Sequence, residues 1–160
     1  MWDHWFRGTE VPCEECPKWN TLANGADRTK RNGQREKQDY DDARAYGSQL
    51  ISARELHSKG VSYVLSQIPE AEAYYITFDI DGYDMTLAPG AASPLPGGIT
   101  YDESMDLLKG ICETGKVVAM DLVEVAPPYD PTGCTERLAA LTILQVIAQA
   151  GKKLHANRTL

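Results

Sequence analysis

From residue 39 onward, short apolar runs alternate with longer segments in which apolar residues recur every three or four positions. The short runs are typical of buried strands, and the longer segments are typical of amphipathic helices. This pattern predicts strands over 49–51, 73–78 and 116–125, and helices that end at Tyr46 or cover 52–68, 101–113 and 135–149. Strands that alternate with helices predict an α/β fold of three layers, with a mainly parallel, doubly wound sheet covered by helices on both faces.

Local signals mark where several of these helices begin and end. Ser52 with Glu55, and Thr100 with Glu103, have the spacing of capping boxes that open a helix. Gly60 interrupts the helical pattern of 52–68. The segment 89–98 is too rich in proline and glycine for regular structure and is predicted to be a loop.

The first 38 residues follow neither period. They are polar, they hold three tryptophans without regular spacing, and they include a charged run over 27–37. We expect residues 1–38 to be an irregular segment and residues 39–160 to form the folded unit.

The chain of 160 residues has 23 acidic and 16 basic residues, for a net charge of −7. This balance argues against a nucleic-acid partner, which would need clustered Lys and Arg. No apolar stretch reaches membrane-spanning length and no signal peptide is evident, so a cytoplasmic protein without a membrane partner is expected.

The cysteines do not form the pattern of a disulfide framework. Cys13 and Cys16 form a C-x-x-C pair that could bind zinc or act in redox chemistry, but Cys112 and Cys134 are distant and lie in helical contexts. The incidental interpretation of this pair is therefore favoured. The acceptor pattern at Asn157 is expected to be unmodified in a chain without a secretory signal.

The strongest chemical signal is the segment 78–84, Phe-Asp-Ile-Asp-Gly-Tyr-Asp, at the end of the apolar run 73–78. Because side chains alternate along a strand, Asp79 and Asp81 are expected to point to the same side. Two such carboxylates repel each other unless a divalent cation such as Mg, Ca or Mn neutralises them. The alternative is a strand-end turn whose aspartates face water and cap the next segment.

Two later segments extend this signal. The loop 88–100 reads Ala-Pro-Gly-Ala-Ala-Ser-Pro-Leu-Pro-Gly-Gly-Ile-Thr, and the run 121–127 reads Asp-Leu-Val-Glu-Val-Ala-Pro. Together with 78–84, these motifs resemble, in order and spacing, the ureohydrolase family of agmatinases, arginases, guanidinobutyrases and formiminoglutamases. The resemblance covers 41–150, and the Pro-Tyr-Asp-Pro ending at 128–131 is most similar to the agmatinase and guanidinobutyrase branch.

The resemblance implies an arginase-like fold and a site with two Mn(II) ions that generate hydroxide. It assigns Asp79 and Asp81 as metal ligands and gives Asp84 a supporting, loop-fixing role. Glu124 would bind the substrate guanidinium, although it could instead cap the turn at Pro127 and Pro128. Asp121 would be a buried partner of the site without contacting metal, and the loop 88–100 would wall the pocket.

The chain also departs from the family pattern. Met85 replaces the usual proline after the third aspartate, and the upstream G-G-D-H and D-A-H-x-D motifs, with their metal ligands and proton-shuttling histidine, are absent. His4, His57 and His155 match neither motif. The chain therefore resembles an N-terminally truncated, carboxyl-terminal half of a ureohydrolase with an incomplete metal shell.

Two functional hypotheses follow from this partial match. One is a manganese-dependent hydrolase that releases urea from a linear guanidino compound, with homo-oligomers expected for the complete protein. The other is a truncated, non-catalytic homologue that acts as a folded fragment or an assembly partner.

Overall fold

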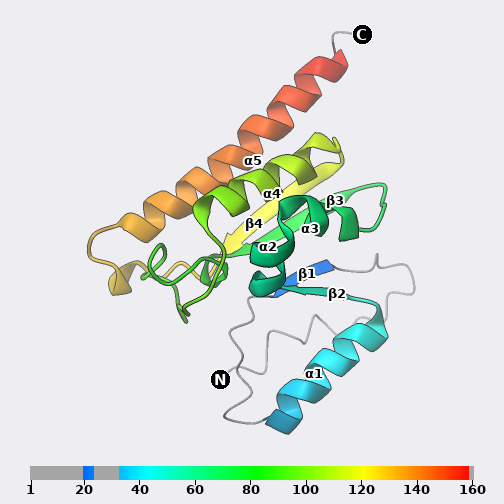
Figure 1. Ribbon diagram of the computed structural model, residues 1–160. Coiled ribbons are helices and arrows are strands. Elements are labelled where there is room, and N and C mark those ends of the chain that lie inside the picture. The colour runs from blue at the N-terminus through cyan, green and yellow to red at the C-terminus, as the bar shows by residue number, and fades with distance from the viewer. Residues whose placement is uncertain (1–19, 24–32, 159–160) are drawn as a thin grey trace.

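A computed structural model of the chain describes residues 20–23 and 33–158, and Figure 1 shows its arrangement. The described strands form two parallel pairs, β1 with β2 and β3 with β4. Their bounds are β1 (Asn20–Ala23), β2 (Gln49–Ser52), β3 (Tyr74–Asp79) and β4 (Val117–Val123). Asp79 is in register with Val123, so β3 and β4 end together at one edge of their pair.

Helices follow the strands in the order that the sequence predicts. They are α1 (Gly33–Tyr46), α2 (Ala53–Lys59), α3 (Val61–Gln67), α4 (Tyr101–Glu113) and α5 (Cys134–Arg158), with 3₁₀ turns η1 (Ile80–Gly82) and η2 (Pro127–Tyr129). In Figure 1, α4 and α5 lie side by side and both cover the β3–β4 pair, while α1 lies beyond β1 and β2. Helices and parallel strands in this arrangement confirm the α/β class.

The local helix signals are confirmed. The Ser52 and Thr100 side chains accept hydrogen bonds from the amides of Glu55 and Glu103 over 3.2 and 3.3 Å, and both capping boxes are complete. Gly60 separates α2 from α3 with a φ of 81°, a left-handed value that favours glycine.

Two element ends differ from the prediction. α5 continues to Arg158 although its apolar pattern stops near residue 150, because Lys152 and Lys153 are good helix formers on an exposed surface. β4 stops at Val123, two residues earlier than predicted, because Glu124 adopts a φ of 66° that no strand accommodates.

The prediction of irregular structure over 1–38 is corrected at two places. Residues 20–23 form β1, which pairs in parallel with β2, and α1 begins at Gly33. Neither element shows an apolar periodicity in the sequence, and β1 depends on a partner 29 positions away in register, Asn20 with Gln49. Cys13, Cys16 and His4 lie outside the described residues.

The two faces of the β3–β4 pair differ. Ile76 and Phe78 pack against the buried cluster that includes Leu108 and Val146 of α4 and α5. On the opposite face Tyr75 and Val118 remain 44% and 71% exposed. Within the described part of the chain, the predicted helical cover is therefore present on one face of this pair.

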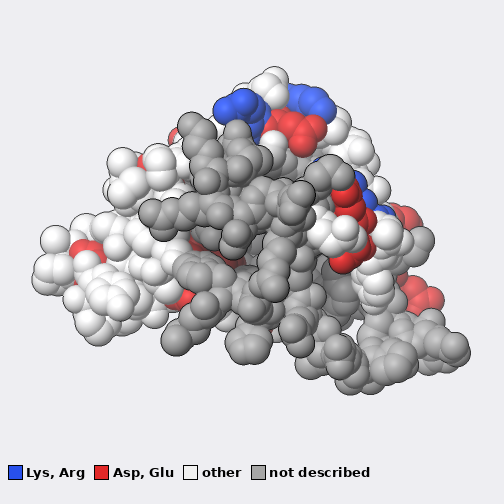
Figure 2. All heavy atoms as spheres, turned by 90° about the horizontal axis from the view of Figure 1, so that it is seen from below, with Lys and Arg blue, Asp and Glu red and all other residues white. Residues whose placement is uncertain are grey.

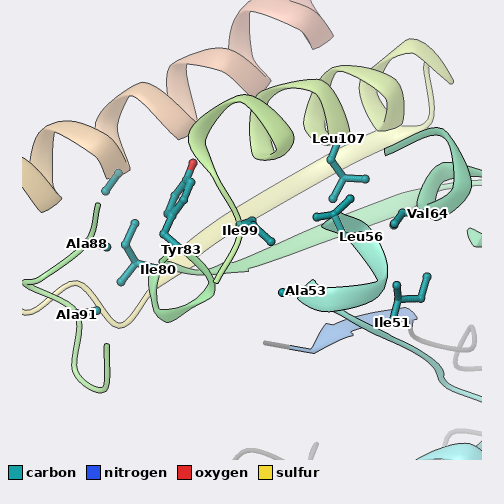
Figure 3. Close-up of a cluster of buried hydrophobic side chains, with 11 residues drawn as sticks. Ile51, Ala53, Leu56, Val64, Ile80, Tyr83, Ala88, Ala91, Ile99 and Leu107 are labelled. Atoms are coloured by element: carbon teal, nitrogen blue, oxygen red, sulfur yellow. The ribbon is translucent and has the colours of Figure 1, made fainter. Parts of the chain in front are cut away.

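Tyr83 connects the turn after β3 to two helices (Figure 3). It is fully buried, its ring lies 5.4 Å from that of Phe78, and its hydroxyl contacts Ser104 Oγ at 2.7 Å and Thr142 Oγ1 at 2.8 Å. Ser104 lies on α4 and Thr142 on α5, so this side chain fixes both helices above the end of β3.

Charged side chains are scattered over the described surface. On the face shown in Figure 2, acidic residues appear at several separate places, and basic residues gather only near the upper and right-hand parts of the view. Within the described residues, no helix combines the length and the apolar character that spanning a bilayer requires.

We expect Tyr83→Phe to lower the free energy of unfolding by about 0.5–1.5 kcal/mol, the net contribution of one buried hydrogen bond. The loss stays small because Ser104 Oγ and Thr142 Oγ1 also donate to the carbonyls of Tyr101 and Leu138. Urea denaturation measures the change, and Tyr129→Phe, at an exposed position, is the control. An unchanged midpoint for Tyr83→Phe would mean that its hydroxyl does not stabilise the fold.

Candidate functional site

The two aspartates after β3 are brought together by a turn. Asp79 is the last residue of β3, and Asp81 lies in η1, where its amide donates to Asp79 Oδ1 over 2.8 Å. The expected reason for their proximity, the alternation of side chains along a strand, is wrong, because the strand ends at Asp79. The 3₁₀ turn η1 instead brings Asp81 next to Asp79.

The electrostatics of Asp79 show that a third carboxylate is near. Burial is the largest cause that raises its pKa to about 6; the charges of Asp81 and Glu124 contribute to this rise, and the hydrogen bond from the Asp81 amide opposes it. Asp79 therefore lies within electrostatic reach of both Asp81 and Glu124 at the carboxyl ends of β3 and β4, where parallel sheets bind their ligands.

Glu124 has an unusual backbone conformation. Its φ of 66° is the only positive value among the described residues other than glycine, and a glutamate in this region carries steric strain. Its carbonyl accepts from the Ala92 amide over 3.2 Å, and Val125 forms a bridge with Ala91. The strained residue is thus held in place by the loop that precedes α4.

That loop joins the ends of both strands. The Ser93 amide donates to Asp81 Oδ1 over 3.1 Å, while the Ala126 amide donates to the Gly90 carbonyl over 2.7 Å. Residues 90–93, which we call the bridging segment, therefore contact Asp81 on one side and the chain around Glu124 on the other. The segment fixes the distance between the two strand ends.

Asp130 and Thr135 anchor the bridging segment to α5. Thr135 Oγ1 accepts from the Gly90 amide and donates to Asp130 Oδ2, each over 2.8 Å, and the Thr135 amide also donates to Asp130. Hydrogen bonds from Thr132 and Thr135 hold the pKa of Asp130 well below its usual range. A Cβ on Gly90 would lie 2.6 Å from Asp130 Cβ, so this contact requires glycine.

Sequence reasoning did not assign Asp130, Thr135 or Gly90 to the site. Asp130 stands in the Pro-Tyr-Asp-Pro motif, where it served only to choose the family branch. The available signal was the glycine inside the loop 88–100, because a glycine often marks a close approach of backbone.

The other two candidate aspartates lie apart from this cluster. Asp84 accepts from the Thr86 amide and hydroxyl and from the Gly97 amide, over 2.6 to 2.9 Å, which are the contacts of a loop-fixing residue. Asp121, opposite Thr77 on β4, accepts from the Tyr75 hydroxyl, and its buried Oδ1 has no hydrogen-bond partner.

A hollow of about 500 Å³ lies beside the loop 88–100 and is lined by residues such as His57, Asp84 and Tyr101. Asp79, Asp81 and Glu124 do not line it. His57 Nδ1 lies 2.8 Å from Glu103 Oε1, so this histidine belongs to the capping region of α4. The side chains of His155 and Asn157 lie outside the described residues.

The donor set fits a hard divalent cation in chemistry but not in number. Carboxylate oxygens are the ligands that Mn and Mg prefer. Asp79 Oδ1 and Asp81 Oδ1 each accept a backbone amide, and no group of three or more His, Cys, Asp or Glu side chains in the described residues could hold a metal ion. The described residues therefore supply at most part of a metal shell.

Comparison with known proteins identifies the relatives of this chain. The family model described as the arginase family matches residues 25–148. A guanidinobutyrase of Pseudomonas aeruginosa is 34% identical over 113 residues, which are 69% of this chain and 35% of the relative. An agmatinase of Salmonella paratyphi B is 37% identical over 111 residues, 67% of this chain and 36% of the relative.

A solved structure agrees with these matches. The agmatine ureohydrolase of Thermoplasma volcanium superposes with a TM-score of 0.67 at 28% identity, covering 77% of this chain and 40% of that one. The chain spans little more than a third of the length of the curated relatives it matches. The ureohydrolase resemblance and the arginase-like α/β fold are confirmed, and the chain belongs to the arginase family.

Proposed function

We propose that residues 39–160 are the carboxyl-terminal half of a cytoplasmic ureohydrolase domain that, when complete, hydrolyses a linear guanidino compound to urea and an amine. The observation that carries this proposal is the placement of Asp79, Asp81 and Glu124 at the joined ends of β3 and β4, where the charges of Asp81 and Glu124 act on Asp79. The names of the relatives, guanidinobutyrase and agmatinase, support this substrate class.

In this proposal the residues of the chain have separate tasks. Asp79 and Asp81 contribute oxygen ligands to a binuclear Mn(II) site whose remaining ligands lie on other parts of the domain. When bound, such ions supply a nucleophile by lowering the pKa of a coordinated water.

Glu124 would bind and orient the guanidinium. A carboxylate forms charge-assisted hydrogen bonds with a planar guanidinium and can engage two of its N–H groups at once. The left-handed backbone of Glu124, held by Ala92, fixes the base of that side chain directly after Val123, the residue in register with Asp79. The bridging segment and Asp130 keep this geometry without contacting the substrate.

The second candidate function is a non-catalytic homologue that folds and takes part in an assembly. The lack of a group of three metal-ligating side chains within the described residues favours it. The two candidates differ in what happens when the rest of a domain is supplied.

The decisive experiment joins residues 39–160 to the upstream part of the guanidinobutyrase or agmatinase relative. We expect no urea from the 160-residue chain, weak Mn(II) binding that Asp81→Ala abolishes, and urea release from 4-guanidinobutyrate or agmatine by the joined protein. A joined protein that folds and binds two metals but releases no urea supports the non-catalytic homologue. Urea release by the 160-residue chain alone would contradict the proposal that its metal site is incomplete.

The raised pKa of Asp79 predicts a pH-dependent stability of the metal-free chain. A carboxyl whose pKa rises from 3.8 to about 6 on folding favours the unfolded state, where it ionises more readily, so the free energy of unfolding falls as pH rises between these values. In EDTA, Asp79→Asn should stabilise the chain by about 1–2 kcal/mol near neutral pH, after allowance for solvent screening.

Urea denaturation across this pH range measures the effect. The gain should disappear at about pH 4, where the Asp79 carboxyl of the folded parent is protonated and therefore uncharged, like the amide of the variant. The exposed Asp106→Asn on α4 is the matched control and should show no such pH dependence. A gain of equal size at both ends of the range would mean that ionisation of Asp79 is not its cause.

Glu124→Gln in the active joined protein separates substrate binding from metal binding. The amide keeps the shape but loses the charge, and charge-assisted bonds contribute about 1.5–3 kcal/mol, so kcat/KM should fall about ten- to a hundredfold. Manganese content, measured by elemental analysis, should equal that of the parent, and the exposed Glu113→Gln should change neither quantity. Loss of manganese with unchanged kcat/KM per bound metal would make Glu124 a ligand or a support.

A further inference from the structure

The alternation of side chains along β4 is interrupted at Glu124. Leu122, in register with Phe78, packs against the buried cluster that includes Ile80, and Val125, three positions later, packs against the same cluster. Residues three positions apart lie on opposite faces of a regular strand. The positive φ of Glu124 therefore acts as a bulge that turns the chain over by one position.

This reversal decides where the Glu124 carboxylate can lie. In an uninterrupted strand, Glu124 would share a face with Leu122 and would enter the apolar cluster that Leu122 joins. In the structure, Val125 takes that place, and the charge of Glu124 acts on Asp79 at the end of β3. The left-handed backbone therefore keeps the carboxylate out of the apolar cluster and at the strand end with Asp79.

Such a conformation persists only where the surroundings impose it. A left-handed glutamate is unfavourable because its Cβ crowds the backbone. The Ala92 amide donates to the carbonyl of Glu124 over 3.2 Å, and the Gly90 carbonyl accepts from the Ala126 amide over 2.7 Å. Because these two hydrogen bonds lie on either side of the strained backbone, residues 90–92 hold it as one unit.

Residues 90–92 are in turn positioned from the first turn of α5. The Gly90 amide donates to Thr135 Oγ1, and this hydroxyl donates to Asp130 Oδ2, each over 2.8 Å. Thr135 is fully buried and Asp130 is 4% exposed, so the two contacts lie inside the protein. Because Asp130 takes the hydroxyl proton, the lone pairs of Thr135 Oγ1 are left for the Gly90 amide.

We propose that Thr135 is a positioning residue that, oriented by Asp130 and acting through Gly90, holds Glu124 in its left-handed conformation. The consequence for substrate binding rests on the proposed function of Glu124, whereas the coupling itself is a property of the metal-free chain. If Thr135 only stabilised the start of α5, its loss would lower the stability of every variant at position 124 equally.

A double-mutant cycle in the 160-residue chain tests the coupling. Glu124→Gly and Glu124→Ala both remove the carboxylate, so the charge near Asp79 changes equally, but only glycine accepts a left-handed backbone without strain. In EDTA, urea denaturation should give the glycine variant a folding equilibrium constant about two- to fivefold larger than that of the alanine variant.

The same pair of variants is then compared in a chain that carries Thr135→Val. Valine keeps the shape of the side chain but removes the hydroxyl that holds Gly90. Residue 124 should relax to an ordinary backbone, where glycine is no better than alanine, and the ratio of the two folding equilibrium constants should fall to one or below. Thr135→Ser keeps the hydroxyl and should keep the advantage of glycine.

Two further backgrounds make the comparison specific. Asp130→Asn weakens the same chain of contacts at its other end and should also remove the advantage of glycine, so the test does not depend on the folding of one variant. Tyr83→Phe is the matched control, because it removes a buried hydroxyl that contacts Ser104 and Thr142 instead of Gly90, and the advantage should persist. No advantage of glycine in the parent, an unchanged advantage in Thr135→Val, or its loss in Tyr83→Phe would each overturn the proposal.

The joined protein tests the consequence for the site. Thr135→Val should lower kcat/KM about tenfold or more because Glu124 is misplaced, and Thr135→Ser should remain close to the parent. Full activity of Thr135→Val would overturn the positioning role. An inactive joined protein together with the expected cycle would contradict the proposed function and support the coupling of Thr135 to Glu124, so the two failures are distinguishable.

Discussion

Three carboxylates, Asp79, Asp81 and Glu124, lie where β3 and β4 end, and hydrogen bonds of the surrounding structure hold the chain around them in place. The turn at η1 places Asp81 beside Asp79, and the bridging segment ties Asp81 to the chain around Glu124. Asp130 and Thr135 then fix that segment to the start of α5. Burial, with the charges of Asp81 and Glu124, raises the pKa of Asp79, so ionisation of this carboxyl opposes folding of the metal-free chain. Such an arrangement is typical of sites that bind a cation.

Much of this could be predicted from the sequence because the signals are local. Capping boxes depend on residues three positions apart, and both are present as expected at Ser52 and Thr100. The motif order places Asp79, Asp81 and Glu124 at strand ends, and parallel pairing brings those ends to one edge. The position of Asp81 was predicted, although for the wrong geometric reason, because a strand period does not reveal that the strand stops at Asp79 and turns.

The features that the sequence did not reveal depend on distant partners. The contact of Thr135 with the Gly90 amide spans 45 positions, and no periodic pattern connects them. The left-handed backbone of Glu124 follows from the Ala91 and Ala92 contacts and not from the preference of glutamate. β1 likewise exists through its pairing with β2, since its four residues have little strand propensity.

The site and the stability of the chain have the same requirement. β3 and β4 pair with each other, and one face of that pair leaves Val118 exposed, while the carboxylates at its end lack enough ligands among the described residues to hold a metal. Neighbouring strands and helices that cover this face would remove apolar surface from water, and the ligands they carry would offset the repulsion around Asp79.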